Sequence, residues 1–437
     1  MSNYTPHTSA EIQAMLDVVG VKSLEQLYQG LESLFVKDMD LPAGKSQQEV
    51  ARYFENLAAE NKVFGSIFLG AGAYQHYIPP VVKSLLSREE FVTAYTPYQA
   101  EMSQGILQGI FEFQTMIAEL TGMQVSNASL YDGSTALADG ILMLGERKKN
   151  KVLVSEAIHP RSLEVVKTYL VPQGIQIEKV ALDENGRTSL ADLKAKLTPD
   201  VFAVAVAQPN FFGVIEDAAA IGEAVKAAGA GYIMQVEPFS CAMLKTPFAC
   251  GADIAVGEGQ PLGMPLSFGG PYLGFVGARE KLVRKLTGRI VGKTSDASGN
   301  DAYVLTLQAR EQHIRREKAA SSICSNQALC ALTATIYMAT AGKTGMKEVA
   351  SQCVSKAHYL AAEMVKIPGF RLKYSAEFFN EFVTVTDTPA DEIIRKCAER
   401  NILAGLKLSG HEILWCATEV NTKADMDQLL AVLKEVK

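Results

Sequence analysis

The sequence predicts an α/β protein, with a large domain built on a mostly parallel sheet and a small C-terminal α+β domain. Between about residues 61 and 310, short apolar segments alternate with segments of helical periodicity, which is the pattern of repeated strand–helix–strand units. After about residue 311 the pattern changes to short strands separated by amphipathic helices. A chain of 437 residues also fits one large and one small domain better than a single core.

Residues 1–60 are predicted to form a helical arm ahead of these domains. Thr8 with Glu11, and Ser23 with Gln26, have the spacing of capping boxes, and apolar residues follow each pair at helical spacing. Amphipathic helices must bury their apolar stripe. We therefore expect the arm to pack on the body of the protein or on a partner chain.

The large domain, residues 61–310, is predicted from its strands. Residues 201–206 form an unbroken apolar run, which suits a strand buried on both faces of a parallel sheet. The other expected strands are 151–155, 175–182, 231–236, 253–256 and 273–276, with helices at 161–170 and 216–228. Because ligands of such sheets bind at the carboxyl ends of the strands, we expect the site there.

The small domain, residues 311–437, begins with an apolar helix at 328–341. Its expected strands are 382–385, 402–404 and 413–416, and its expected helices are 389–400 and 423–435. The mixture predicts a compact α+β domain that ends the chain.

The composition predicts a soluble cytoplasmic protein that binds neither nucleic acid nor membrane. A net charge of −6 and a pI of about 5.7 give no electrostatic basis for nucleic-acid binding. The seven cysteines are scattered and lack metal-ligand spacing, which favours a reducing compartment. No apolar run approaches the roughly 20 residues of a membrane span, and the first residues lack a secretion-signal pattern.

Three segments ending in Gly-Lys-Ser or Gly-Lys-Thr, at residues 44–46, 292–294 and 342–344, imitate a phosphate-binding P-loop. Each lacks the first glycine of that motif. Gly70 and Gly72 likewise have no third glycine in register for a dinucleotide fingerprint. A nucleotide or nicotinamide cofactor is therefore not expected.

A polar stretch at residues 95–105 leads into a helix. Pro97 restricts its own φ and the conformation of the preceding residue, so we expect a stiff turn. A polar loop before a helix N-terminus suits a polar or anionic ligand, although packing against a neighbouring domain explains it as well. The polar side chains that we select from this loop are Tyr95, Thr96, Tyr98, Gln99 and Glu101.

A second notable run, residues 308–316, concentrates positive charge. It holds Arg310, His313, Arg315 and Arg316, and its pattern predicts a helix with a cationic face. Such a face suits carboxylates of a partner or substrate. A solvated, salt-bridged surface is the alternative.

Residues 95–105 closely resemble a signature of the glycine-decarboxylating P-protein of the glycine cleavage system. A second match covers residues 288–292, 305–316 and 322–329, ending in Ser-Ile-Cys-Ser-Asn-Gln-Ala-Leu. The resemblance spans nearly the whole chain, to the separately encoded first (α) subunit of the two-subunit form. It implies the type I fold of enzymes that use pyridoxal phosphate (PLP).

A PLP enzyme needs a lysine for the Schiff base, a carboxylate at the pyridinium nitrogen and donors for the phosphate. The phosphate candidates are Gly133, Ser134 and Thr135, which follow Asp132 and open a helix, although an ordinary helix cap explains them equally. The resemblance to PLP enzymes suggests Glu237 as the pyridinium carboxylate and His159 as the residue that stacks on the ring. Each is also explicable as a structural residue.

The lysine position, by resemblance to the catalytic P-protein subunit, falls at or beside Pro261. Proline has no amine, and residues 251–279 contain no lysine. Lys245 and Lys281 flank the region without the expected surroundings. We therefore expect this chain to have no catalytic lysine and to bind no PLP covalently.

The resemblance implies an α2β2 P-protein whose β subunit carries PLP. That enzyme decarboxylates glycine and transfers the aminomethyl group to the lipoyl arm of H-protein. The isolated α chain is expected to be inactive and to contribute residues of the loop at 95–105 to a pocket at the subunit interface. Two alternatives stay open: a self-sufficient PLP-dependent amino acid decarboxylase or desulfurase, and a non-catalytic scaffold subunit.

Overall fold

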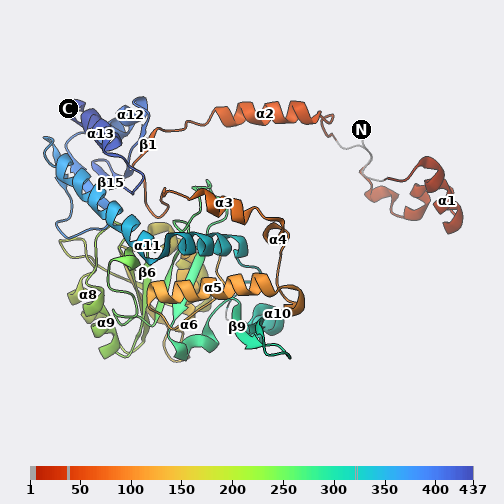
Figure 1. Cartoon of the computed structure of the whole chain (residues 1–437), viewed down its shortest axis with the longest axis horizontal. Helices are drawn as coiled ribbons and strands as arrows, with labels where there is room; N and C mark the ends of the chain where they lie inside the picture. Colours follow the sequence, from red (N-terminus) through yellow and green to blue (C-terminus); the bar gives the residue numbers. More distant parts are fainter. Residues whose placement is uncertain (1–5, 37–39, 320, 322, 437) are drawn as a thin grey trace. The chain divides into compact units, whose positions relative to one another are not determined.

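The computed structural model describes residues 6–36, 40–319, 321 and 323–436 (Figure 1). The chain divides into two compact units, Met1–Val63 and Phe64–Lys437. None of the helices in the described part of the chain combines the length and apolar character that a membrane crossing requires.

The first unit contains the helices α1 and α2 and two short 3₁₀ helices. Helix α1 (Ser9–Val19) opens with the expected capping box, because Thr8 Oγ1 accepts from Glu11 N at 3.3 Å and Glu11 Oε2 accepts from Thr8 N at 2.7 Å. Helix α2 (Gln47–Ala59) has a second box, formed by Ser46 and Glu49.

The capping box expected at Ser23 and Gln26 is wrong. Residues Leu24–Tyr28 form a short 3₁₀ helix, η1, whose N-cap residue Ser23 makes no side-chain capping bond. The side chain of Gln26 instead accepts from Lys22 N at 2.7 Å. Tighter winding changes the positions of the first backbone N–H groups, so the spacing of an α-helical box no longer fits. A second 3₁₀ helix, η2, covers Glu32–Leu34.

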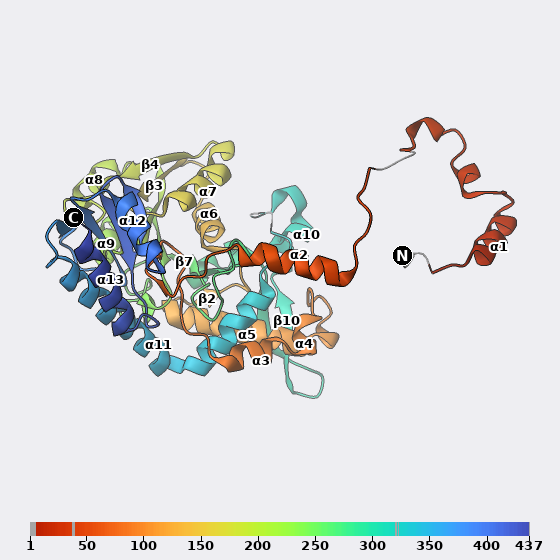
Figure 2. The ribbon, with the colours of Figure 1, turned by 90° about the horizontal axis from the view of Figure 1, so that it is seen from above.

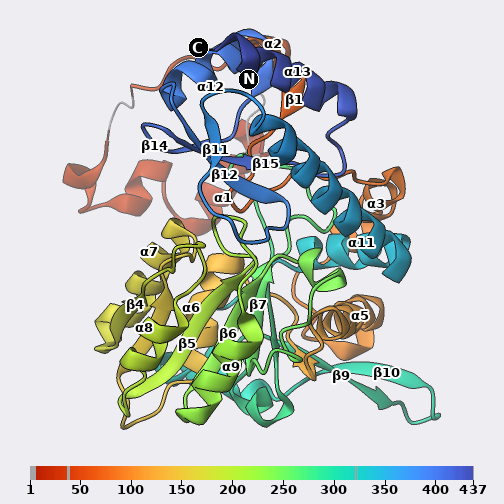
Figure 3. The ribbon, with the colours of Figure 1, turned by 90° about the vertical axis from the view of Figure 1, so that its left-hand side faces the viewer.

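The second unit contains the predicted large sheet, with seven strands in the order β2-β8-β7-β6-β5-β3-β4 (Figure 3). The five strands from β7 to β4 pair in parallel, whereas β8 runs antiparallel to β7 and to β2. The sheet is therefore mostly parallel, as predicted. Its strands are β2 (Val125–Ser126), β3 (Lys151–Ser155), β4 (Gln176–Val180), β5 (Val201–Gln208), β6 (Gly231–Val236), β7 (Ile254–Glu258) and β8 (Gly274–Ala278).

The sheet carries a hydrophobic core on each face. Strand β5 is buried along its whole length, and its successive residues contribute to opposite cores: Val204 and Val206 to one, Ala205 and Ala207 to the other. The first core also contains side chains of α5, α9 and α11, and the second contains those of α6 and α7. The helices of this domain are α3 (Pro80–Leu86), α4 (Glu89–Val92), α5 (Gln104–Thr121), α6 (Gly133–Met143), α7 (Pro160–Leu170), α8 (Leu190–Lys196) and α9 (Ala218–Ala227), with 3₁₀ turns η3 (Ala100–Met102), η4 (Val171–Gln173), η5 (Ser240–Ala242) and η6 (Glu280–Lys285).

The predicted cationic helix at residues 308–316 is wrong. After the hairpin β9 (Ile290–Ser295) and β10 (Asp301–Thr306), the chain forms three short pieces: η7 (Gln308–Arg310), α10 (Gln312–Arg315) and η8 (Arg316–Lys318). Leu307 and Arg316 both have a φ of 53°, a left-handed conformation that interrupts a helix. Arg310 turns inward and donates from Nη1 to the carbonyl of Leu286, so the four basic residues do not share one face.

The small C-terminal domain has the predicted α+β composition, with an antiparallel sheet in the order β11-β12-β15-β14 (Figure 3). Its helices α12 and α13 are labelled in Figure 2. Trp415 of β15 is fully buried and donates from Nε1 to Thr384 Oγ1 at 2.8 Å. Strand β1 (Ser66–Ile67) pairs with β13 (Ile402–Leu403), so the second unit begins against this domain. The remaining elements are α11 (Ala328–Met364, kinked at Gly342), β11 (Phe370–Leu372), β12 (Glu381–Thr386), α12 (Ala390–Glu399), β14 (Leu406–Ser409), β15 (Glu412–Cys416) and α13 (Lys423–Glu435).

Candidate functional site

A cleft of about 350 Å³ lies at the carboxyl ends of β5, β6 and β7, where the fold predicts a ligand site. The structure brings together there the residues that the sequence suggested for a cofactor. The cleft is lined by Gly133, Ser134, His159, Glu237 and Pro261, among others. Thr135 lies one residue further into α6 and is not part of the lining.

The start of α6 forms a complete helix cap. Asp132 Oδ1 accepts from Thr135 N at 2.8 Å, and Thr135 Oγ1 accepts from Asp132 N at 3.2 Å. The hydroxyl of Ser134 is hydrogen-bonded to that of Ser162 at 2.9 Å. The cap alone therefore accounts for Asp132 and Thr135, which was one of the two interpretations of these residues.

A carboxylate of the same chain occupies the first N–H donor of this helix. Glu258 Oε2 accepts from Gly133 N at 2.9 Å, and Oε1 accepts from Gln260 N at 2.9 Å and Leu273 N at 3.0 Å. Burial raises the pKa of Glu258 to about 7. The nearby charge of Asp132 also raises this pKa, whereas the three N–H donors lower it. The amide of Gly133, expected for a phosphate, is already used.

The imidazole of His159 is fixed in one orientation. Its Nδ1 accepts from Arg161 N at 3.1 Å, and its Nε2 lies 3.1 Å from the carbonyl of Ala71, which assigns the proton to Nε2. Burial lowers the pKa of His159, so the ring is neutral near pH 7. Phe211 packs edge-on against it at 4.9 Å between ring centroids.

Glu237 follows β6, as expected, but its carboxylate is bonded within its own turn. Oε1 accepts from Phe239 N at 3.0 Å and Oε2 from Ser240 N at 2.6 Å. Burial raises the pKa of Glu237 to about 7, although the nearby His76 and these two hydrogen bonds act to lower it. Glu237 thus lines the cleft while its carboxylate accepts from the backbone N–H groups at the start of η5.

Pro261 lies in a tight turn after β7, in the wall of the cleft. The neighbouring Gln260 is buried. Its Oε1 accepts from Tyr74 N and its Nε2 donates to the carbonyl of Tyr74, each at 2.9 Å. Within the described residues no lysine lines the cleft, and Lys281 is paired with Asp253 at 2.8 Å. The cleft of this chain therefore does not fit covalently bound PLP.

Sequence reasoning missed Glu381, a third carboxyl of the cleft that lies deep in the protein. It accepts from Ala71 N at 2.6 Å and from Tyr74 Oη at 2.7 Å, and burial raises its pKa to about 7. Its partners lie more than 300 residues away in the chain. The one local signal of such a site was a charged residue at the first position of the otherwise uncharged strand β12.

A second polar cluster joins the two stretches singled out in the sequence, residues 95–105 and 288–329. The hydroxyl of Tyr95 lies 2.9 Å from Ser325 Oγ, and that of Tyr98 accepts from Arg289 Nη2 at 3.0 Å. The Tyr98 ring also meets the imidazole of His313 edge-on, with centroids 5.8 Å apart. We call these five residues the tyrosine cluster.

The cluster combines exposed tyrosine side chains with a buried arginine. Tyr95 is 79% and Tyr98 51% exposed, whereas Arg289 is 5% exposed. Gln99 and Glu101 are exposed as well, and Thr96 is half-buried. These predicted interface residues thus form a polar surface, and no residue of the tyrosine cluster lines the cleft at β5–β7 among the described residues.

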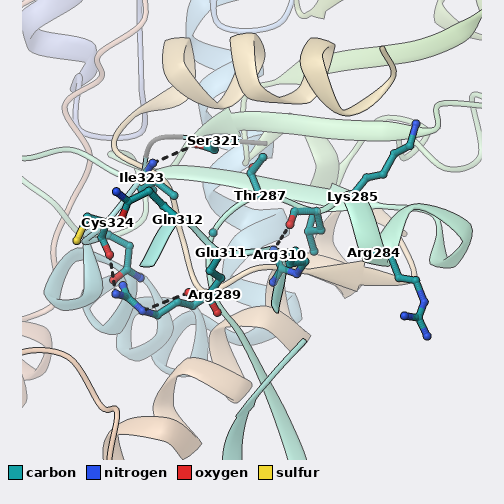
Figure 4. Close-up of a pocket in the computed structure, with 13 residues that line it drawn as sticks. Arg284, Lys285, Thr287, Arg289, Arg310, Glu311, Gln312, Ser321, Ile323 and Cys324 are labelled. Atoms are coloured by element: carbon teal, nitrogen blue, oxygen red, sulfur yellow. Dashed lines mark hydrogen bonds and ion pairs between the residues drawn. The ribbon is translucent and has the colours of Figure 1, made fainter. Parts of the chain in front are cut away.

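Arg289 also borders a narrow pocket of about 30 Å³ (Figure 4). It donates from Nη2 to the carbonyl of Cys324, and its Nε lies 3.8 Å from Glu311 Oε2. Arg310 reaches into the same pocket toward Leu286 (Figure 4). Sequence reasoning missed Arg289 as a site residue, although it lies within the matched run 288–292.

Comparisons with known proteins agree with this geometry. A family model described as glycine cleavage system P-protein matches residues 2–433. The probable glycine dehydrogenase (decarboxylating) subunit 1 of Desulfitobacterium hafniense is 49% identical, with 100% of each chain covered. The crystal structure of a glycine decarboxylase (P-protein) of the glycine cleavage system, in inhibitor-bound form, has a TM-score of 0.92 and 42% identity, with 100% of each chain covered.

A more distant structure shares the fold alone. A C-DES mutant with Gly covalently linked to the PLP cofactor has a TM-score of 0.65 at 16% identity, covering 87% of this chain and 98% of its own. The type I PLP-dependent fold expected from the sequence is therefore confirmed. The matches over the full length and the shared fold together establish that the chain belongs to the glycine cleavage system P-protein family.

Proposed function

We propose that this chain is the subunit without a catalytic lysine in a two-subunit glycine decarboxylase. Its homologous β partner holds PLP, which withdraws electrons from the substrate and makes loss of a carboxylate feasible. The complex decarboxylates glycine and passes the aminomethyl group to the lipoyl arm of H-protein. The subunits assemble as α2β2 in the cytoplasm.

One observation carries this proposal: residues 251–279 contain no lysine, in a chain that matches a subunit 1 protein along its whole length. By resemblance to the catalytic P-protein subunit, the Schiff-base lysine position falls at or beside Pro261. A chain without an amine at that position cannot form the covalent link to PLP that the chemistry requires. A partner must therefore supply the lysine. This argues against a self-sufficient decarboxylase or desulfurase.

The contribution of this chain to the reaction is proposed to come from the tyrosine cluster and its loop. Exposed hydroxyls can bind the carboxylate of glycine or the cofactor at a shared pocket, together with Thr96, Gln99 and Glu101. The buried Arg289 fixes the Tyr98 hydroxyl through a bond of 3.0 Å. A group held in place before binding loses little entropy when the pocket is completed.

The helical arm is proposed to dock on the β partner. Within the arm, Leu16 is the one buried apolar side chain of α1, while Val18 is 89% exposed. Helix α2 likewise leaves Tyr53 and Phe54 more than half exposed. Deleting residues 1–60 should weaken assembly with the partner, measured by analytical ultracentrifugation, while the circular dichroism of the remaining chain persists.

The experiment that tests the function is reconstitution. The full-length chain, its β partner and lipoylated H-protein are purified separately, and release of CO2 from carboxyl-labelled glycine is measured. We expect turnover only when both subunits are present. Turnover by this chain with PLP alone would establish the self-sufficient enzyme, and full turnover after simultaneous Tyr95→Phe and Tyr98→Phe substitution would support the scaffold alternative.

A further inference from the structure

Glu258 is the last residue of β7, and its carboxylate turns toward the start of α6. It accepts three backbone N–H bonds, from Gly133, Gln260 and Leu273, at 2.9 to 3.0 Å. The first backbone N–H groups of a helix have no partner within the helix and lie at its positive end. The carboxylate therefore satisfies the first N–H of α6, that of Gly133, together with two N–H groups of the neighbouring segments.

One of these donors, the N–H of Gly133 at the start of α6, is a group that a phosphate would use. An anion at the N-terminus of a helix is stabilised by free N–H groups and by the helix dipole. The backbone of Glu258 also runs close against this helix, since a Cβ built at Gly133 would lie 2.9 Å from Glu258 N. The position at the helix start is thus filled from within the chain.

We propose that Glu258 is a built-in substitute for a phosphate group, which holds the start of α6 and excludes phosphate-bearing ligands, PLP included, from this cleft. The inference rests on the proposed function and deepens it, because Glu258 is a second feature, besides Pro261, that disfavours PLP binding by this chain.

The charge of the cleft points the same way. Its lining includes the carboxyl groups of Asp132, Glu237, Glu258 and Glu381, against Arg161 as the one permanent cation among the described lining residues. An entering phosphate would meet the Glu258 carboxylate at hydrogen-bond distance from the donors it needs. Two anions at one buried position repel each other strongly.

The proposal is tested by removing the carboxylate and offering inorganic phosphate in its place. The full-length chain and its Glu258→Ala variant are titrated with phosphate at pH 8 by calorimetry, with thermal unfolding in parallel. We expect no saturable binding by the unmodified chain and saturable binding by the variant. At a phosphate concentration of 100 times Kd, the ratio of folded to unfolded variant should rise about a hundredfold.

Glu381→Ala is the matched control, because it deletes a buried carboxyl of the same cleft. Glu381 accepts from one backbone N–H, that of Ala71, and one phenol, and it does not lie at a helix start. We expect this variant to gain no saturable phosphate binding. Equal gains in both variants would overturn the proposal, since the effect would then reflect a general loss of negative charge.

Two further outcomes are decisive. Saturable phosphate binding by the unmodified chain at pH 8 would overturn the proposal if the Ser134→Glu variant loses it. That loss would place the bound phosphate in the cleft, which Ser134 lines. The Glu258→Ala variant could fail to fold in buffer without phosphate. In that case, refolding in phosphate but not in chloride of equal ionic strength supports the proposal, and failure to refold in either salt overturns it. Glycine turnover by the complex is a separate readout, so the proposed function can stand or fall independently.

Discussion

The cleft at β5–β7 and the tyrosine cluster use polar residues in opposite ways. In the cleft, the carboxyls of Glu237, Glu258 and Glu381 are withdrawn from solvent and bonded to donors of their own chain. In the cluster, two tyrosine hydroxyls lie on exposed side chains; that of Tyr98 accepts from the buried Arg289, and that of Tyr95 is paired with Ser325. Polar groups of the cleft are thus bonded within the chain, whereas the tyrosine side chains of the cluster lie at the surface.

The largest expected effect concerns Arg289, the buried support of the cluster. Its side chain and that of Glu311 are both nearly buried, with Nε and Oε2 3.8 Å apart. Arg289→Met leaves the Glu311 charge buried without its partner and should cost about 3–5 kcal/mol of unfolding free energy. Urea unfolding of the full chain measures this loss.

The double variant Arg289→Met/Glu311→Met provides the control for Arg289. Removing both charges should recover much of the lost stability, because an apolar pair avoids the unpaired buried charge. If the unfolding free energy of the single Arg289→Met variant lies within about 1 kcal/mol of that of the unmodified chain, the buried Arg289 does not stabilise the cluster as expected.

An intermediate effect is expected from Tyr98→Phe, which removes one hydroxyl and keeps the ring. If that hydroxyl contacts a charged group in the shared pocket, its loss costs about 1.5–3 kcal/mol, or roughly ten- to hundredfold in kcat/KM of the complex. Tyr77→Phe is the control, since Tyr77 is 61% exposed and lies outside the cluster. Unchanged kcat/KM in both Tyr95→Phe and Tyr98→Phe would refute the shared-pocket role.

An effect of similar size, on the pH dependence of stability, sharpens the description of the cleft. The pKa of Glu258 rises from an ordinary value of 4.5 to about 7 on folding, so the folded chain binds its proton more tightly than the unfolded chain. This group therefore lowers stability as pH rises from about 4.5 to 7. Because a glutamine side chain cannot ionise, Glu258→Gln should gain on the order of 2–3 kcal/mol relative to the unmodified chain over that range.

Chemical denaturation of both proteins at matched pH values checks this prediction. Taking the difference between them cancels the contributions of Glu237 and Glu381, whose pKa values burial also raises to about 7. A difference that stays constant from about pH 4.5 to about pH 7 would mean that Glu258 does not titrate in this range.

Local sequence patterns predicted the fold well and the site in part. The apolar run at 201–206 and the segments at 151–155 and 231–236 became strands because each pattern is local and each strand is buried. The absence of a lysine from residues 251–279 could be read from the sequence, whereas the placement of the Schiff-base lysine position at or beside Pro261 stays a prediction. By contrast, Glu258 meets Gly133 across 125 residues, a contact that no local pattern encodes.

The errors have the same origin. The run at 308–316 has helical composition, yet Arg310 turns to the carbonyl of Leu286 and left-handed residues divide the segment. Tertiary contacts there outweigh helix propensity. The meeting of Tyr98 with Arg289, 191 residues apart in the chain, likewise required the structure.

The most direct test of the division of labour between the two subunits is the location of the covalently bound cofactor. The reconstituted complex is reduced with borohydride, and each chain is analysed by peptide mass spectrometry for pyridoxyl-lysine. We predict the modification on one lysine of the β partner and none on this chain. A pyridoxyl group at high occupancy on Lys245, Lys281 or another lysine of this chain would contradict the account.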